Sequence, residues 1–120
     1  MNFGRLNLYH RILLYRHPVN MNKSIDGLCA IALAELDVDP CSKTLFVFVN
    51  RSRDKIKMLL WENNGFWIFY KRLESQRFAW PDWFDEDSLS LTSELLDQLV
   101  SGFNVNGMRP HKRLEFSFHL

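Results

Sequence analysis

The chain contains 120 residues, of which 47% are hydrophobic and 24% are charged, and its net charge is +1. This length and composition suit one globular domain with a buried core, and we expect a single domain over residues 1–120 with flexible ends at 1–10 and 107–120. No apolar run approaches the roughly 20 residues of a membrane span, and the N-terminus lacks the apolar block of a signal peptide. We therefore expect a cytoplasmic protein without a membrane partner.

The first elements of the chain are a short strand and a helix. Residues 12–15 are apolar and predict the strand. Over about 23–36, apolar residues recur at three- to four-residue spacing, which predicts a helix with Asn22 or Ser24 as its N-terminal cap. We expect the helix to end before Pro40. Proline lacks the backbone N–H that a helix needs, and it disfavours the helical conformation in the residue before it.

Residues 44–50 are apolar on both alternating faces, which is typical of a central strand buried on two sides. Side chains alternate across a strand. We therefore expect one face to carry Phe46 and Phe48 and the other to carry Leu45, Val47 and Val49.

The middle of the chain predicts a β-hairpin. Residues 55–61 and 66–72 are rich in aromatic and other apolar side chains and are joined by Asn63-Asn64-Gly65, whose residue types favour a tight turn. Together with 44–50, these segments indicate an antiparallel meander. A further short strand is predicted over 77–80.

The last third of the chain predicts a connector, a second helix and a tail. We expect a connector over 81–91 and a helix over about 92–101 with Thr92 as its cap. The tail from 107 is either an edge strand or disordered. The predicted fold class is therefore α+β, an antiparallel sheet of four or five strands with two helices packed on one face.

Charge is distributed in blocks. Residues 51–80 contain seven cations and three carboxylates, whereas residues 81–99 contain six carboxylates and no cation. This pattern indicates one basic face opposed by an acidic segment around Trp83-Phe84-Asp85-Glu86-Asp87. Because alternate residues of a strand share a face, we expect Arg53, Lys55 and Lys57 to form a one-sided basic stripe.

The basic residues of the hairpin and the tail are the candidate DNA contacts. Lysine and arginine neutralise phosphates, while aromatic rings stack on exposed bases. The candidate DNA-binding residues are Arg51, Arg53, Lys55, Lys57, Lys71, Arg72, Arg77, Arg109, His111 and Lys112. Nine of the seventeen aromatic residues fall within 61–84, so we expect some to be exposed. The candidate contacts to a protein partner are Trp67, Trp80, Trp83 and Phe84.

No catalytic or metal-binding constellation stands out. The four histidines lie at no recognised metal-ligand spacing, and nucleotide-binding and serine-hydrolase motifs are missing from the sequence. Asp26 and Asp54 lie where capping and turn formation already favour aspartate. The two cysteines, Cys29 and Cys41, lack a redox or zinc spacing, and we expect both to be inert thiols. We therefore expect no enzyme activity and no cofactor.

The hairpin region also carries a family resemblance. The chain resembles the small accessory protein of the insertion sequence 66 family of bacterial transposable elements, the TnpB-like product of their second open reading frame. The residues that carry the resemblance are Asp39-Pro40, Leu45 through Lys57, Trp61, Asn64-Gly65-Phe66-Trp67, Tyr70 through Glu74, Arg77-Phe78 and Trp80-Pro81, with Met21 through Leu28 upstream and Arg109 through Lys112 downstream.

The sequence departs from that family at two positions. Asn22 and Ser52 stand where the family typically has arginine, the second within an Arg-Arg-Arg-Asp run. The resemblance implies a helper encoded by a mobile element that acts with a separate transposase.

Two hypotheses about function follow. The first is an accessory protein that binds DNA at the ends of the element through the basic residues. The second is an adaptor that assembles or regulates the transposase complex through exposed aromatic residues and the acidic segment, without direct DNA contact.

Overall fold

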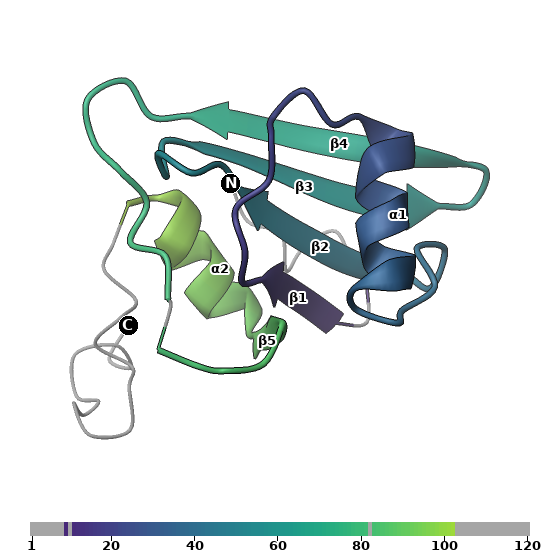
Figure 1. Cartoon of the computed structure of the whole chain (residues 1–120). Coiled ribbons are helices and arrows are strands. Elements are labelled where there is room, and N and C mark those ends of the chain that lie inside the picture. The colour runs from purple at the N-terminus through teal and green to yellow at the C-terminus, as the bar shows by residue number, and fades with distance from the viewer. Residues whose placement is uncertain (1–8, 10, 82, 103–120) are drawn as a thin grey trace.

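The computed structural model describes residue 9, residues 11–81 and residues 83–102. Seven elements follow one another along the chain (Figure 1): β1 Arg11–Tyr15, α1 Ile25–Ala34, β2 Thr44–Val49, β3 Lys55–Glu62, β4 Gly65–Arg72, β5 Ser88–Leu91 and α2 Ser93–Val100. The strands form one sheet in the order β4-β3-β2-β1-β5. The α+β fold class predicted from the sequence is confirmed.

The meander predicted in the middle of the chain is confirmed. β2 pairs antiparallel with β3, and β3 pairs antiparallel with β4 over its full length. The turn between β3 and β4 consists of Asn63 and Asn64, and the positive φ of 57° falls on Asn63. Gly65 is already the first residue of β4. Asparagine tolerates this left-handed conformation, so the turn chemistry read from the sequence was correct.

The other half of the sheet differs from the prediction. β1 pairs parallel with β2, so the sheet is mixed. A parallel neighbour needs a crossover connection, and α1 with its flanking loops supplies it. β5 lies within the predicted connector and pairs antiparallel with β1. The strand predicted over 77–80 is wrong, because this segment has no strand pairing and its Phe78 and Trp80 side chains enter the core.

The two helices cover opposite faces of the sheet, which corrects the prediction that both pack on one face. Leu28 of α1 belongs to the same core cluster as Phe46 and Phe48 of β2. Leu96 of α2 belongs to the other cluster, together with Val47. Figure 1 shows α1 in front of the sheet. The alternation of β2 therefore holds as predicted, and each of its faces contacts a different helix.

The N-terminal caps of the two helices can be compared with the caps predicted from the sequence. α1 is shorter than the predicted 23–36, and Ser24 is its N-cap residue without a side-chain capping bond. Thr92 caps α2 as predicted, because its Oγ1 accepts a hydrogen bond of 3.2 Å from the Leu95 amide. No helix in the described part of the chain is both long and apolar enough to span a membrane.

Candidate nucleic-acid interface

The turn between β2 and β3, residues 50–54, is held by several hydrogen bonds, and we call it the platform. The side-chain oxygen of Asn50 accepts hydrogen bonds from the amides of Asp54 (3.1 Å) and Lys55 (3.0 Å), and its Nδ2 donates to Asp54 Oδ1 at 2.7 Å. Arg53 closes the turn with a positive φ of 61°. Because the half-buried Asn50 side chain bonds to the far side of the turn, the intervening residues Arg51 and Ser52 point outward, and both are exposed.

A second segment joins this platform. After β4, the amide of Leu73 donates to the Asp54 carbonyl (2.8 Å) and the amide of Phe78 donates to the Arg53 carbonyl (2.7 Å). Lys55 pairs across the sheet with Arg72. These contacts bring five of the candidate cations to one end of the sheet. We call this group the basic end, and it consists of Arg51, Arg53, Lys55, Arg72 and Arg77.

The predicted stripe on one strand face is wrong at Arg53, because β3 begins only at Lys55. Lys57 is on β3, but its ammonium donates to the carbonyls of Met21 (2.6 Å) and Lys23 (2.9 Å) and lies 5.9 Å from the Tyr70 ring centroid. The Lys57 side chain therefore holds the loop before α1 against the sheet.

Lys71 also has a structural contact. Its ammonium donates to the Val100 carbonyl at 2.7 Å, at the C-terminal end of α2. A cation is favourable there because the helix dipole leaves partial negative charge on the last carbonyls. Lys71 faces α2, whereas its neighbour Arg72 pairs with Lys55 on the opposite face. The two residues therefore lie on opposite faces of the sheet and cannot contact DNA through one surface.

Carboxylates neutralise part of the basic end. Asp54 lies 3.4 Å from the Lys55 ammonium, and Glu74 lies 2.9 Å from Arg72. The hydrogen bond from Asn50 and the neighbouring Lys55 lower the pKa of Asp54, so that its carboxylate stays charged. In the described part of the chain, Arg51 and Arg77 have no such carboxylate partner, and both are exposed.

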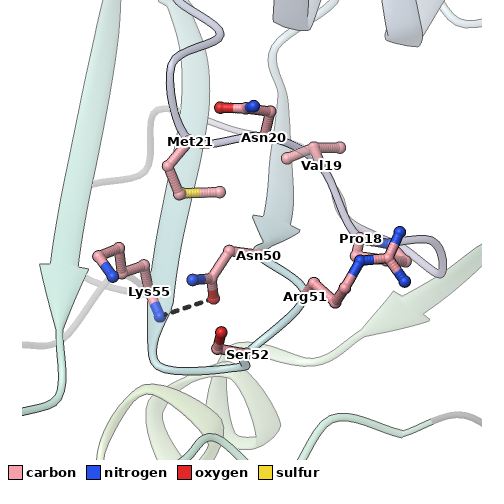
Figure 2. A pocket seen from close by; sticks show the side chains of 8 residues that line it. All are labelled: Pro18, Val19, Asn20, Met21, Asn50, Arg51, Ser52 and Lys55. Atoms are coloured by element: carbon pink, nitrogen blue, oxygen red, sulfur yellow. Dashed lines mark hydrogen bonds between the residues drawn. The ribbon is translucent and has the colours of Figure 1, made fainter.

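A hollow of about 410 Å³ opens beside the platform. The loop Pro18 to Met21 forms one side, and the other side is formed by Asn50, Arg51, Ser52 and Lys55. Figure 2 shows Asn50 between this loop and Ser52, with Arg51 on the side of Pro18. The amide of Val19 donates to the Val49 carbonyl at 2.8 Å, which fixes the loop against the end of β2. The hollow therefore has a rigid wall and a cationic rim.

The acidic segment lies at the same end of the sheet but at its other margin. Asp87 precedes β5, its carbonyl accepts from the Arg16 amide at 2.8 Å, and its carboxylate lies 3.0 Å from His17. Four strand spacings of about 4.8 Å separate β5 from β4. The sum of these four spacings exceeds the Debye length of about 8 Å at physiological salt. The charges of the acidic segment are therefore largely screened from the cations at the end of β4.

Two of the four candidate partner-binding aromatics are unavailable at the surface. Trp80 is 1% exposed and Phe84 is 6% exposed, because the segment after β4 enters the core on the α2 side of the sheet. Trp83 is half-buried against the same cluster. Trp67 is 53% exposed, and so is Tyr70, which the sequence did not single out for a partner. The expectation that some rings are exposed is confirmed.

The remaining candidates are placed as follows. Arg109, His111 and Lys112 lie outside the described residues. Among the residues that the structure describes, no group of three or more histidine, cysteine, aspartate or glutamate side chains is arranged to hold a metal ion. Cys29 is half-buried, and desolvation raises the pKa of its thiol, which disfavours the reactive thiolate. Cys41 is exposed.

The fold and the site define a small α+β protein with a cationic sheet end. The sequence matches the family described as IS66 Orf2 like protein over residues 10–110, and the chain belongs to this family. Membership associates the chain with transposition of IS66 elements, so the resemblance seen in the sequence is confirmed.

Two curated relatives come from Sinorhizobium fredii. The chain is 30% identical over 94 residues to the uncharacterized protein y4jC, an alignment that covers 78% of this chain and 80% of the relative. It is 32% identical over 69 residues to the uncharacterized protein y4hO, with coverage of 58% and 59%. No solved structure gives a significant match.

Proposed function

We propose that this chain is a non-catalytic accessory protein for transposition of a bacterial insertion sequence, and that it binds DNA through the basic end. Membership of the IS66 Orf2-like family supports the link to transposition. The observation that supports DNA contact is the pair Arg51 and Arg77. Both side chains are exposed, and the hydrogen bond from Phe78 to Arg53 holds their two segments together.

The chemistry of this pair suits a phosphate backbone. A guanidinium remains charged at any physiological pH and donates two parallel hydrogen bonds to phosphate oxygens. Ser52 adds a hydroxyl donor at the rim of the hollow beside Arg51. Since phosphate contacts carry no sequence information by themselves, we expect the basic end to supply affinity and orientation on the DNA.

The test is a salt titration of duplex DNA binding by the double variant Arg51→Gln/Arg77→Gln. Each phosphate contact contributes about −0.9 to the slope of log K against log salt, so the variant's slope should be flatter by nearly two units. Affinity at moderate salt should fall for every DNA sequence tested. The fold should persist, because both residues are exposed in loops.

A matched control removes the same charge at the other end of the sheet. Arg11 is the first residue of β1, and Lys43 immediately precedes β2. Both are exposed, and they lie at the end of the sheet opposite the basic end. The double variant Arg11→Gln/Lys43→Gln should retain the wild-type slope. Equal losses of DNA affinity in the two double variants would mean that the affinity depends on the net charge of the protein and not on the basic end. Unchanged binding in the Arg51/Arg77 variant would refute the proposal.

The second candidate function is an adaptor for the transposase complex. The observation that favours it is the exposed Trp67 ring, which lies away from the basic end near the β3–β4 turn. Such a contact would be mainly apolar and therefore insensitive to salt. Salt-insensitive association with the transposase, abolished by Trp67→Ala and accompanied by no measurable DNA affinity, would favour the adaptor.

The absence of catalysis is part of the proposal and has its own test. We expect purified protein to neither cleave nor join DNA with Mg²⁺ or Mn²⁺. Metal-dependent nicking that persists through purification and disappears in Asp26→Asn or Asp54→Asn would contradict it.

A further inference from the structure

The sheet has two edges, and they differ in length. β5 at one edge has four residues, whereas β4 at the other edge has eight. β4 pairs only with β3 in the described part of the chain. Its outer side therefore presents a long row of backbone N–H and C=O groups. Natural sheets protect such an edge or use it to pair with another strand.

The rings on β4 indicate what kind of partner fits this edge. Three large hydrophobic side chains are exposed among the described residues, and two of them, Trp67 and Tyr70, are on β4. Trp67 pairs with Leu60 on the α2 face, whereas Tyr70 pairs with Lys57 on the α1 face. A helix packed on one face of the sheet would cover only one of these rings. An added strand covers rings on both faces, because its own side chains alternate.

The charges along β4 indicate the identity and direction of that strand. Glu62 lies beside the first residue of β4, and Lys71 lies near the other end of β4 on the same face of the sheet. An antiparallel copy of the same strand brings the cationic end of each copy to the acidic end of the other. A parallel copy would place like charges together, which is destabilising. The edge is therefore complementary to itself in the antiparallel direction.

We propose that β4 pairs antiparallel with β4 of a second copy of this chain, so that the two sheets become continuous across a two-fold axis. With Ile68 at the axis, Phe66 lies opposite the partner's Tyr70 and Trp67 lies opposite the partner's Phe69. Aromatic pairs of this kind stabilise neighbouring strands on both faces. The pairing is isologous, since each copy contributes the same surface. It does not depend on DNA binding.

The test is the oligomeric state of the full chain, measured by sedimentation over a wide concentration range. Wild-type protein should change from the 14.3 kDa monomer to twice that mass as the concentration rises. Lysine on an edge strand opposes strand addition. Trp67→Lys/Tyr70→Lys should therefore raise the dissociation constant at least about tenfold, the equivalent of roughly 1.4 kcal/mol.

The chain offers a matched control in Leu33, the third exposed large hydrophobic residue, which lies on α1 at 58% exposure. Leu33→Lys should dimerise as the wild type does. Hydrogen exchange of wild-type protein provides a second readout if the lysine variant does not fold. The β4 amides that point away from β3 should gain protection as concentration rises.

Three results would overturn the proposal. The first is a wild-type protein that stays monomeric at every concentration. The second is a dimer in which the outer β4 amides remain unprotected or the Trp67→Lys/Tyr70→Lys variant associates normally. The third is protection of β4 only when the transposase is added, which would assign the edge to a heterologous strand.

Discussion

β2 and β4 belong to the same sheet and have similar apolar sequences, yet the structure uses them differently. All six residues of β2 are buried, because α1 and α2 cover its two faces and β1 and β3 cover its two edges. β4 lies two positions away, and four of its eight residues are exposed. The central strand therefore supplies stability, while the edge strand and the strand ends are free for binding.

The largest expected effect is a charge inside β2. Val47 is fully buried in the cluster under α2, so Val47→Asp places an unpaired carboxylate in the core. A penalty of several kcal/mol is comparable to the whole stability of a domain, about 5–15 kcal/mol, and we expect the variant to unfold. Circular dichroism and thermal melting provide the measurement. Tyr70→Asp on β4 is the control and should melt close to wild type at low protein concentration.

Ring truncation should sharpen the same comparison. Phe46→Ala leaves a cavity at a fully buried position and should cost about 3–5 kcal/mol in urea denaturation. Trp67 is half-exposed and stacks on Phe69 with ring centroids 6.1 Å apart, so Trp67→Ala should cost only about 1 kcal/mol. Equal costs would mean that β4 is as integral to the core as β2.

The turns that flank these two strands should also differ in their contribution to stability. Asn50→Ala removes three hydrogen bonds from the turn after β2 and should cost about 1–3 kcal/mol. Asn64→Ala, in the exposed turn before β4, should change stability by less than about 0.5 kcal/mol. Denaturation of the two variants side by side gives the measurement. A neutral Asn50→Ala would show that the platform does not need its side-chain bonds.

The smallest expected effect is the pH response of Asp54. Its pKa lies below the ordinary value of 3.8, mainly because of the hydrogen bond from Asn50. A lowered pKa means that the charged carboxylate stabilises the fold above about pH 4 and that this contribution disappears as the pH falls through the folded-state pKa. Urea denaturation at about pH 7 and about pH 3 should show a smaller acid-induced loss in Asp54→Asn than in wild type. An identical loss in both proteins would refute this role.

The structure also changes how the basic residues should be tested. The stripe predicted from sequence suggests replacing Arg53, Lys55 and Lys57 together. Lys57 holds the Met21 and Lys23 carbonyls, so its loss would disturb the loop before α1 as well as any DNA contact. Replacing Arg51 and Arg77 instead tests DNA binding with less effect on folding, because both side chains are exposed.

The local elements and the family can be read from the sequence alone. The alternating apolar residues of 44–50, the hairpin over 55–72 and the Thr92 cap of the second helix were read correctly, as the structure confirms. Each of these features depends on residues within a few positions of one another, where side-chain period, turn conformation and capping act directly.

The surfaces that the protein presents depend on how the whole chain packs. The parallel pairing of β1 with β2, the separation of the helices onto opposite faces and the burial of Trp80 follow from packing the whole sheet. The contacts of Lys57 and Lys71 join residues 36 and 29 positions apart in the sequence. The sequence does not show whether a given lysine contacts water, a phosphate or a backbone carbonyl. Its role is therefore set by the groups that folding brings within hydrogen-bond distance of its ammonium.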